Sequence, residues 1–262
     1  MDSTTRPLAV VTGASSGIGL ELARLFATNG YDLVIAAEDA DIETAARDLE
    51  TLGAAAEAVQ TDLATYDGVE ALAARLDGRP VAALALNAGA GAGGPFLEND
   101  LAKELGIIQL NVASTVHLAK RVLPGMVARG EGRVLITASI ASVIPGAFSA
   151  VYNATKAFDL SFAQAIRNEL KDSGVTVTAL MPGATDTDFF ERADMMDTKA
   201  ATGAKDDPAA VAKDGYDALM AGDDHVVAGA VKNRIQATVA NVTPDTVLAE
   251  MHRGMAEPGT GH

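Results

Sequence analysis

The sequence predicts a doubly wound α/β protein, in which helices cover both faces of a parallel sheet. Two observations support this prediction. Short apolar or β-branched runs, typical of buried strands, alternate along the chain with longer segments of helical periodicity. The first such run also leads through a glycine-rich turn directly into a helix. Strands that alternate with helices of this length are joined by right-handed crossovers, and such crossovers make the sheet parallel.

Seven runs are expected as strands, at 8–12, 32–37, 56–61, 81–87, 133–139, 175–181 and 225–229. Helices are expected from about 18 to 30 and at 42–52, 66–76, 101–128 and 150–171. Helical periodicity then continues through 230–255. No linker, repeat or low-complexity segment divides the chain, so one domain is predicted. Its core covers about 8–229, including a loop segment at about 184–207, and a C-terminal extension covers 230–262.

Composition and charge exclude several classes of function. The 262-residue chain is 48% hydrophobic and 21% charged, as globular proteins are, and no apolar run reaches the ~18 residues that a membrane span needs. The N-terminus lacks an apolar signal segment, so we expect a cytoplasmic protein. The formal charge of -15 argues against a nucleic-acid partner, because phosphate backbones are bound mainly by Lys and Arg. With no cysteine and four scattered histidines, neither a thiol nucleophile nor a metal site is expected.

The turn at 12–19 reads Thr-Gly-Ala-Ser-Ser-Gly-Ile-Gly and separates a strand from a helix. Glycines let the backbone turn sharply and approach a ligand closely. The free N–H groups and the dipole at the helix start attract a pyrophosphate. The turn is therefore predicted to bind a dinucleotide. The predicted contacts are Gly13, Ser15, Ser16, Gly17, Ile18 and Gly19.

The end of the second strand should reach the adenosine ribose of such a dinucleotide. Glu38 lies nineteen residues after Gly19, close to the ~20-residue offset of an acid that accepts from the ribose hydroxyls. An acid there repels a 2′-phosphate, and neither Ser15 nor Ser16 supplies a cation, so NAD is favoured and NADP is not excluded. Two alternatives remain: a one-residue register shift would place Ala37 there, and Glu38 could instead cap the following helix.

Asp62 follows the third expected strand, whose carboxyl end should face the same crevice. Its carboxylate is placed to accept a hydrogen bond from the adenine amino group. Leu63, next in the chain, is included among the predicted cofactor contacts. The alternative for Asp62 is a helix N-cap.

Tyr152 and Lys156 are four residues apart in a segment expected to be helical, so both side chains lie on one face. The ammonium would favour the phenolate and lower the tyrosine pKa from its ordinary value of about 10 toward a range useful for proton transfer. A surface helix can carry this pair by accident. The assignment therefore depends on the rest of the chain.

Several motifs, taken in order, resemble those of the short-chain dehydrogenase/reductase family. They are Thr12 to Gly19, Asn87-Ala88-Gly89, Asn111, Ser139, Tyr152-x-x-x-Lys156, Pro182-Gly183 and Thr187. The resemblance spans about residues 8–190. It implies a Rossmann fold and an NAD(P)-dependent oxidoreductase that moves a hydride between the nicotinamide and a small-molecule secondary alcohol or ketone. It also implies a homodimer or homotetramer, assembled through the helices at 101–128 and 150–171.

The resemblance also implies catalytic roles. Tyr152 would be the general acid in ketone reduction and the base in alcohol oxidation. Lys156 would lower the tyrosine pKa and hold the nicotinamide ribose, and Ser139 would polarise the substrate oxygen. Asn111 would hold the water that connects Lys156 to solvent. The alternatives are a helix or turn cap for Ser139 and a satisfied buried amide for Asn111.

Further cofactor contacts are implied at two strand ends. Asn87, Ala88 and Gly89 would stabilise the sheet beside the adenine ribose. Thr187 would contact the nicotinamide carboxamide. The implied contacts after the sixth strand are Pro182, Gly183, Thr185 and Thr187.

Each of three segments has two possible interpretations. The aromatic and methionine side chains within 189–196 either form an apolar lid over a bulky substrate or pack a helix onto the body. The glycine-rich loop 91–94 is either closely packed backbone or a mobile rim. The extension either covers the substrate pocket or enlarges a subunit contact, and residues 257–262 are expected to be disordered.

Other functional classes fit less well. The chain has no Gly-x-Ser-x-Gly elbow for a hydrolase, and its glycine turn is not followed by the Lys-Ser/Thr of a P-loop. The remaining alternative is a catalytically weak dinucleotide-binding sensor or scaffold protein of the same fold.

Overall fold

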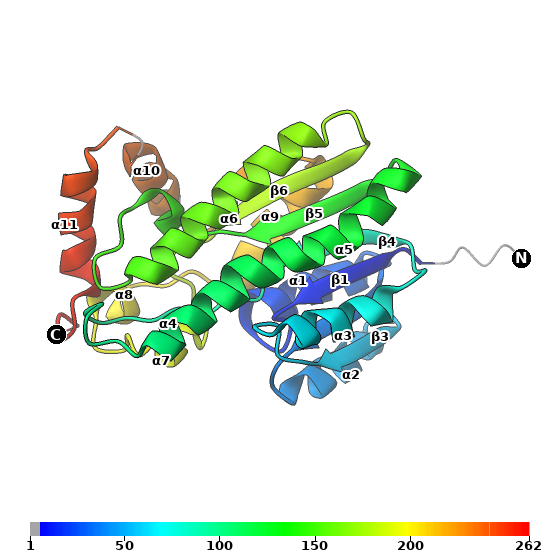
Figure 1. The fold of residues 1–262 in the computed structure, drawn as a ribbon, viewed down its shortest axis with the longest axis horizontal. Helices are drawn as coiled ribbons and strands as arrows, with labels where there is room; N and C mark the ends of the chain where they lie inside the picture. Colours follow the sequence, from blue (N-terminus) through cyan, green and yellow to red (C-terminus); the bar gives the residue numbers. More distant parts are fainter. Residues whose placement is uncertain (1–5, 241, 262) are drawn as a thin grey trace, which may run out of the picture.

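One parallel sheet forms the centre of the protein (Figure 1). The computed structural model describes residues 6–240 and 242–261. Within them the sheet has seven strands in the order β3-β2-β1-β4-β5-β6-β7. They are β1 (Leu8–Thr12), β2 (Asp32–Ala37), β3 (Ala56–Gln60), β4 (Val81–Leu86), β5 (Gly132–Thr137), β6 (Val175–Met181) and β7 (His225–Val227). The predicted doubly wound α/β fold is confirmed.

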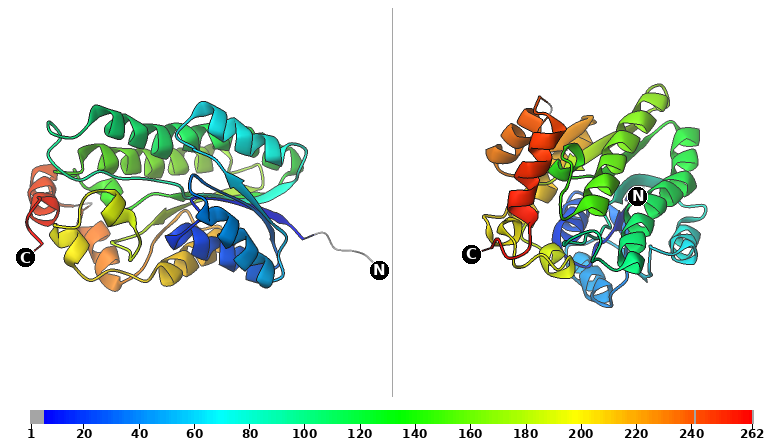
Figure 2. Two further views of the ribbon diagram at one scale, coloured as in Figure 1. Left: turned by 90° about the horizontal axis from the view of Figure 1, so that it is seen from below. Right: turned by 60° about the vertical axis from the view of Figure 1, so that its left-hand side comes forward.

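Helices cover both faces of this sheet, as Figure 2 shows. On one face lie α1 (Gly17–Thr28), α2 (Asp41–Thr51) and α9 (Pro208–Ala221), and on the other α3 (Tyr66–Leu76), α5 (Ser114–Arg129) and α6 (Ala150–Glu169). Phe26 and Leu219 are fully buried in the first layer, and Leu72 and Leu118 in the second. Burying each such side chain stabilises the fold by about 1.5–3 kcal/mol.

The sheet contains a reversal of chain order that positions a ligand site. β1 pairs with β2 on one side and with β4 on the other. In open parallel sheets a crevice forms beyond the carboxyl ends of the strands at such a reversal. The loops that follow β1, β2, β4, β5 and β6 leave the sheet at this edge, so their residues are brought together there.

Some predicted boundaries are wrong. The expected strands at 56–61, 81–87, 133–139 and 225–229 end at residues 60, 86, 137 and 227, and the helix expected at 150–171 ends at 169. At two of these strand ends the next residues bond outside the ladder: the Asn87 amide donates to the carbonyl of Thr12, and the Ser139 hydroxyl accepts from the N–H of Ala141 in the turn that follows. These two candidate site residues therefore lie just beyond the ends of β4 and β5.

The helix expected at 101–128 is also interrupted. α4 (Leu101–Ile108) and α5 are separated by one π-helical turn, Gln109–Ala113. Asn111 lies in this turn, and its side chain bonds the backbone of Ala90 on a different loop. The wider π-helical turn interrupts the α-helix at the point where the Asn111 amide is held against that loop.

The C-terminal extension is helical, as its periodicity predicts, and forms α10 (Val231–Ala240) and α11 (Asp245–Ala256). α11 packs against α8 (Lys199–Thr202), and its Ala256 is buried. The expected disorder is wrong for residues 257–261, because the N–H groups of Gly259 and Gly261 donate to the carboxylate and the carbonyl of Asp197, each at 2.8 Å. His262, for which disorder was also expected, and residues 1–5 of the N-terminal segment lie outside the described residues.

Within residues 6–240 and 242–261, no helix combines the length and apolar character that crossing a membrane requires. In the same part of the chain, no three His, Asp or Glu side chains gather into a possible metal site. The organisation as a single domain stays a prediction.

Candidate active site

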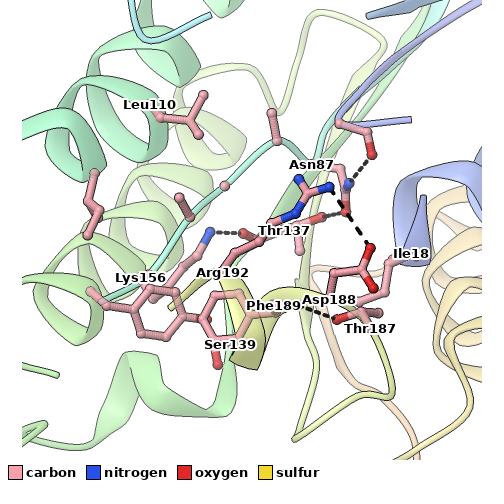
Figure 3. Close-up of a pocket in the computed structure, with 18 of the residues that line it drawn as sticks. Ile18, Asn87, Leu110, Thr137, Ser139, Lys156, Thr187, Asp188, Phe189 and Arg192 are labelled. Atoms are coloured by element: carbon pink, nitrogen blue, oxygen red, sulfur yellow. Dashed lines mark hydrogen bonds and ion pairs between the residues drawn. The ribbon is translucent and has the colours of Figure 1, made fainter. Parts of the chain in front are cut away.

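A cavity of about 740 Å³ opens at the carboxyl edge of the sheet (Figure 3). The loops after β1 to β6 form its walls, and one residue of α11 contributes to them. Of the residues that the sequence assigned to the site, Asn111 alone does not line this cavity. The structure therefore brings the other predicted residues together around one space.

The glycine turn forms one end of the cavity. Gly13 and Gly17 have positive φ angles of 65° and 54°, a region that side chains disfavour. A Cβ on Gly19 would lie 2.0 Å from the carbonyl oxygen of Gly13, so no larger residue fits there. α1 begins beside this turn, and Ser16 at its N-cap makes no side-chain capping bond. The first N–H groups of α1 are thus positioned for an anion.

Asn87 and Thr12 connect three strand ends beside the glycine turn. The Asn87 amide donates to the carbonyl of Thr12 at 3.2 Å and accepts from the Thr137 hydroxyl at 3.1 Å. The Thr12 hydroxyl accepts from the N–H groups of Asn87 and Ala88 at 2.9 and 3.0 Å. These bonds hold β1, β4 and β5 together at the crevice, as the resemblance implies.

The acidic residue that contacts the glycine turn is Asp39, which the sequence analysis missed. Its carboxylate accepts from the Ser15 hydroxyl at 2.9 Å, while its other oxygen is buried and has no partner among the described residues. Glu38, the predicted ribose acid, is exposed at the cavity rim. Glu38 does not cap α2, whose N-cap is Ala40. Both acids thus line the cavity beyond β2, and the ribose contact predicted for Glu38 stays a prediction.

Asp62 and Leu63 line the cavity where the adenine was expected. The Asp62 carboxylate accepts from the N–H of Ala64 at 2.8 Å, which closes a local turn. The N-cap of α3 is Thr65, whose hydroxyl accepts from the N–H of Gly68. The alternative that Asp62 caps this helix is therefore wrong.

Tyr152 lies near the start of α6, half-buried in the cavity wall. Burial raises the pKa of its phenol, while the Lys156 ammonium and the Ser139 hydroxyl lower it and the Asp159 carboxylate raises it. Burial dominates, so the phenol keeps its proton at neutral pH. A protonated phenol beside a hydroxyl is suited to give a proton to an oxygen in the cavity.

Lys156 and Asp159 form a buried ion pair one turn below Tyr152. The ammonium is 3.1 Å from the Asp159 carboxylate, and the two residues are 5% and 1% exposed. The ammonium also donates to the carbonyl of Thr137 at 2.7 Å, a bond drawn in Figure 3. Burial raises the pKa of Asp159, and Lys156 opposes this rise. Asp159 was missed, although its spacing of three residues from Lys156 places both on one helix face.

Ser139 is both a cap and a cavity residue. Its hydroxyl accepts from the N–H of Ala141 at 3.0 Å at the start of the 3-10 turn Ile140–Val143, so the structural alternative for this residue is correct. The same hydroxyl donates to the carbonyl of Pro182 through a long bond of 3.4 Å. A carbonyl oxygen in the cavity can compete for that proton, because a bond of this length is weak.

Asn111 is a fully buried amide whose hydrogen bonds are satisfied. Its carbonyl oxygen accepts from the N–H of Ala90 at 2.9 Å, and its amide donates to the carbonyl of Ala90 and to the hydroxyl of Thr155. The structural alternative for Asn111 therefore holds. Its side chain joins the loop after β4 to α6, between Tyr152 and Lys156.

The segment after β6 closes the other end of the cavity. Thr187 lies against Gly17, and the Phe189 ring is 5.1 Å from the ring of Tyr152. Phe189, Phe190 and Met195 line the cavity, whereas Met196 does not and is 55% exposed. Three of the four apolar side chains thus serve the cavity.

The glycine-rich loop after β4 is closely packed. A Cβ on Gly91 would lie 2.6 Å from Phe189, and one on Gly93 would lie 2.4 Å from Met195. Glycine is required there because the loop backbone touches the segment that closes the cavity. Close packing, rather than a mobile rim, explains these residues.

Pro182, Gly183 and Thr185 line the cavity as the resemblance implies, and Thr185 is buried. The hydroxyl of Thr185 donates to the carbonyl of Gly183 at 3.0 Å. A Cβ on Gly183 would meet Asn233 of α10 at 2.4 Å, so the extension packs directly against this loop.

Two further cavity residues escaped sequence reasoning. Arg192 lies 3.9 Å from Asp188 (Figure 3) and 4.0 Å from Asp39. His252 of α11 lines the cavity and bonds the carbonyl of Ala147, 105 residues away in the chain. No local pattern marks either residue, because their neighbours in space are distant in sequence.

The residues present fit a nicotinamide dinucleotide. A turn that admits only glycine and an uncapped helix start suit a pyrophosphate, and the unpartnered buried oxygen of Asp39 lies beside them. Tyr152 and Lys156 occupy the opposite part of the same cavity. The arrangement offers a binding site at one end and a proton donor at the other.

Comparisons with known proteins agree with this geometry. The family of short chain dehydrogenases matches residues 7–197. A 1-deoxy-11-beta-hydroxypentalenate dehydrogenase from Streptomyces arenae is 37% identical over 201 residues, which cover 73% of this chain and 71% of that protein.

Two solved structures are also similar. A short-chain dehydrogenase from Sphingobium yanoikuyae in complex with NADPH is 30% identical, with a TM-score of 0.80 over 84% of this chain and 87% of that one. L-sorbose reductase from Gluconobacter frateurii, complexed with NADPH and L-sorbose, is 27% identical, with a TM-score of 0.74 over 88% of this chain and 99% of that one. The chain therefore belongs to the short-chain dehydrogenase/reductase family of NAD(P)-binding oxidoreductases.

Proposed function

We propose that this enzyme interconverts a secondary alcohol and a ketone, with Tyr152 as general acid and base. The observation that supports this proposal is that Tyr152, Ser139 and Lys156 line the same cavity as the glycine turn. The bound nicotinamide would supply or accept the hydride. Transfer of a hydride to a carbonyl carbon leaves an oxygen that needs a proton, and the half-buried phenol of Tyr152 is a proton donor in the cavity wall.

The other side chains bind, orient and shield. The N–H groups at the start of α1 would hold the pyrophosphate, and the Lys156 ammonium would hold the nicotinamide ribose. Ser139 donates a hydrogen bond to the substrate oxygen and polarises it. Phe189 covers the reacting region from water. The water role of Asn111 stays a prediction; its side-chain amide already bonds Ala90 and Thr155, and its backbone carbonyl accepts from the Thr115 hydroxyl at 2.8 Å.

The test is turnover, followed at the nicotinamide absorbance band with NADH and NADPH against a panel of ketones, and with the oxidised cofactors against secondary alcohols. Reduction of panel ketones supports the proposal. Cofactor binding without turnover of any compound would instead support the dinucleotide-sensor alternative.

Reaction direction should depend on pH through Tyr152. Because burial raises its pKa, alcohol oxidation, which needs the phenolate, should increase toward alkaline pH, while ketone reduction keeps its rate at neutral pH. Asp159→Asn removes a charge that raises this pKa and frees Lys156 to lower it. The rise of kcat/KM for oxidation with increasing pH should therefore have its midpoint at lower pH. A shift in the opposite direction would contradict this coupling.

Cofactor choice rests on Asp39 and Arg192. The NAD preference predicted from Glu38 stays a prediction, while solved relatives that hold NADPH favour NADP. Asp39 disfavours a 2′-phosphate, whereas the Arg192 guanidinium, 4.0 Å away, is a cation within reach of one. We propose that the balance between these two side chains sets the preference.

Asp39→Asn should raise the ratio of kcat/KM with NADPH to that with NADH by at least about fivefold, since two charges 4 Å apart interact by ~1 kcal/mol even in water. Arg192→Leu should lower the same ratio. Glu38→Gln is the matched control, because it removes an equal charge from the exposed neighbour. A larger effect from Glu38→Gln than from Asp39→Asn would restore the original assignment.

We also propose a homodimer or homotetramer through α4, α5 and α6, and a cytoplasmic location. Leu101 and Leu105 on α4 are 70% and 50% exposed, and Phe158 on α6 is 36% exposed, which supports a contact on this side. Sedimentation measures the subunit state.

A further inference from the structure

The C-terminal extension contributes one residue to the cavity, within the described ranges 230–240 and 242–261. This residue is His252 on α11. Two contacts fix the helix that carries it: Ala256 is buried in the cluster formed by Phe190 and Met195, and the Arg253 guanidinium lies 4.9 Å above the Phe148 ring. The position of the imidazole is therefore determined by packing around the part of the cavity that closes over the substrate.

Hydrogen bonding assigns the two ring nitrogens of His252. Nδ1 is 2.8 Å from the carbonyl oxygen of Ala147. A carbonyl can only accept, so Nδ1 carries the hydrogen and Nε2 of the neutral ring carries a lone pair. Burial also lowers the pKa of His252, which keeps the ring neutral at pH 7. Among the described residues Nε2 has no hydrogen-bond partner, which leaves it an acceptor without a donor.

The cavity around this acceptor is poorly suited to an anionic substrate. Three cations line it, and each lies beside a carboxylate: Lys156 by Asp159, Lys103 by Asp194, and Arg192, toward the glycine turn, by Asp188 and Asp39. A neutral imidazole adds no positive charge. Phe189, Phe190 and Met195 supply apolar wall. Two acceptors without a partner among the described residues face this wall from the lining, Nε2 of His252 and the buried Oδ1 of Asn153, and only the first comes from the extension.

We propose that His252 selects substrates carrying a second hydroxyl group, remote from the reacting carbon, by accepting its hydrogen bond at Nε2. The substrate class is thus a hydroxylated ketone and the corresponding diol, rather than a keto acid. The inference rests on the proposed function, because it assumes that the ketone binds between Tyr152 and the closed end of the cavity. His252 then specifies the substrate, and Tyr152 and Ser139 act on its carbonyl.

The test compares straight-chain methyl ketones of increasing length, each ending in a hydroxyl, with the matched ketones that end in a methyl group. The wild-type enzyme should prefer the hydroxylated ketone at one or more lengths. His252→Phe should lower kcat/KM for the preferred compound about tenfold, since one neutral hydrogen bond is lost, and leave its methyl-ended partner nearly unchanged. His252→Gln, whose carbonyl oxygen is an acceptor, should recover part of the preference.

Met251→Gln is the matched control, because Met251 is the neighbouring residue on α11 and is 58% exposed. Equal preference for both compounds in the wild type at every length would overturn the inference, and so would a preference that survives His252→Phe. Loss of preference in Met251→Gln as well would show a general effect of the helix and would also count against it.

Failure of the proposed function gives a different result. If the wild type reduces no ketone of either kind, the hydride-transfer proposal fails. Calorimetric binding of the same pairs in the presence of NADP⁺ then decides the role of His252 alone. Tighter binding of a hydroxylated ketone that His252→Phe abolishes supports the inference, and equal binding of the pair rejects it.

Discussion

Tyr152→Phe is expected to lower kcat for ketone reduction by about 100- to 10,000-fold, the usual contribution of a positioned general acid. The substitution removes one hydroxyl and leaves the ring, which packs 5.1 Å from Phe189, in place. Because the glycine turn and the start of α1 lie in a different part of the cavity, the dissociation constant for the cofactor should remain nearly unchanged. Steady-state kinetics and calorimetric titration measure the two quantities.

Tyr66→Phe is the matched control for this substitution. Tyr66 is 66% exposed and packs on His117, away from the cavity. It should retain wild-type turnover. Comparable losses of turnover and cofactor affinity in Tyr152→Phe would contradict the assigned proton-transfer role and indicate damage to the binding site.

Lys156→Met is expected to lower the free energy of unfolding by about 3–5 kcal/mol, because it leaves the buried Asp159 carboxylate without its partner. Burial holds the folded-state pKa of Asp159 above its unfolded value. The neutral carboxyl is therefore favoured in the folded state, and the stability deficit of Lys156→Met should increase as pH rises and shrink as pH falls. Denaturant unfolding at acidic and alkaline pH measures this dependence.

Two further variants distinguish the effect of breaking the buried ion pair from the effect of removing a lysine in general. Adding Asp159→Leu to Lys156→Met should recover most of the lost stability, because no unpaired charge then remains in the interior. Lys213→Met removes the lysine of an exposed pair with Asp217 and should leave the free energy of unfolding nearly unchanged. A single Lys156→Met variant as stable as Lys213→Met would show that the buried pair is not a structural requirement.

Local patterns predicted the sheet and most of the site. Period and spacing were enough to place the glycine turn and to put Tyr152 and Lys156 on one helix face, whereas Asn87 and Ser139 were assigned from the family resemblance. Asp39 was missed because the sequence does not define which of two adjacent acids faces inward where β2 ends. Glu38 had the expected offset, but the direction of a side chain beyond a strand depends on the twist and bonding of that loop.

Long-range contacts account for what the sequence could not predict. The π-helical turn exists where Asn111 bonds Ala90, 21 residues away, and helical periodicity carries no information about that bond. The order of residues 257–261 depends on Asp197, which lies about sixty residues earlier in the chain. His252 reaches the cavity only after the extension has folded over the segment that follows β6.

The bonds between Asp197 and residues 259–261 bear on how the enzyme should be handled in the laboratory. Asp197 belongs to the segment that closes the cavity, so the last described residues hold that segment from outside. A tag or linker that follows residues 259–261 closely would therefore begin beside the substrate-closing segment, and truncation after α11 would remove the anchor of that segment. Substrate profiles are best compared on protein tagged at the N-terminus, because β1 begins at the opposite edge of the sheet from the cavity.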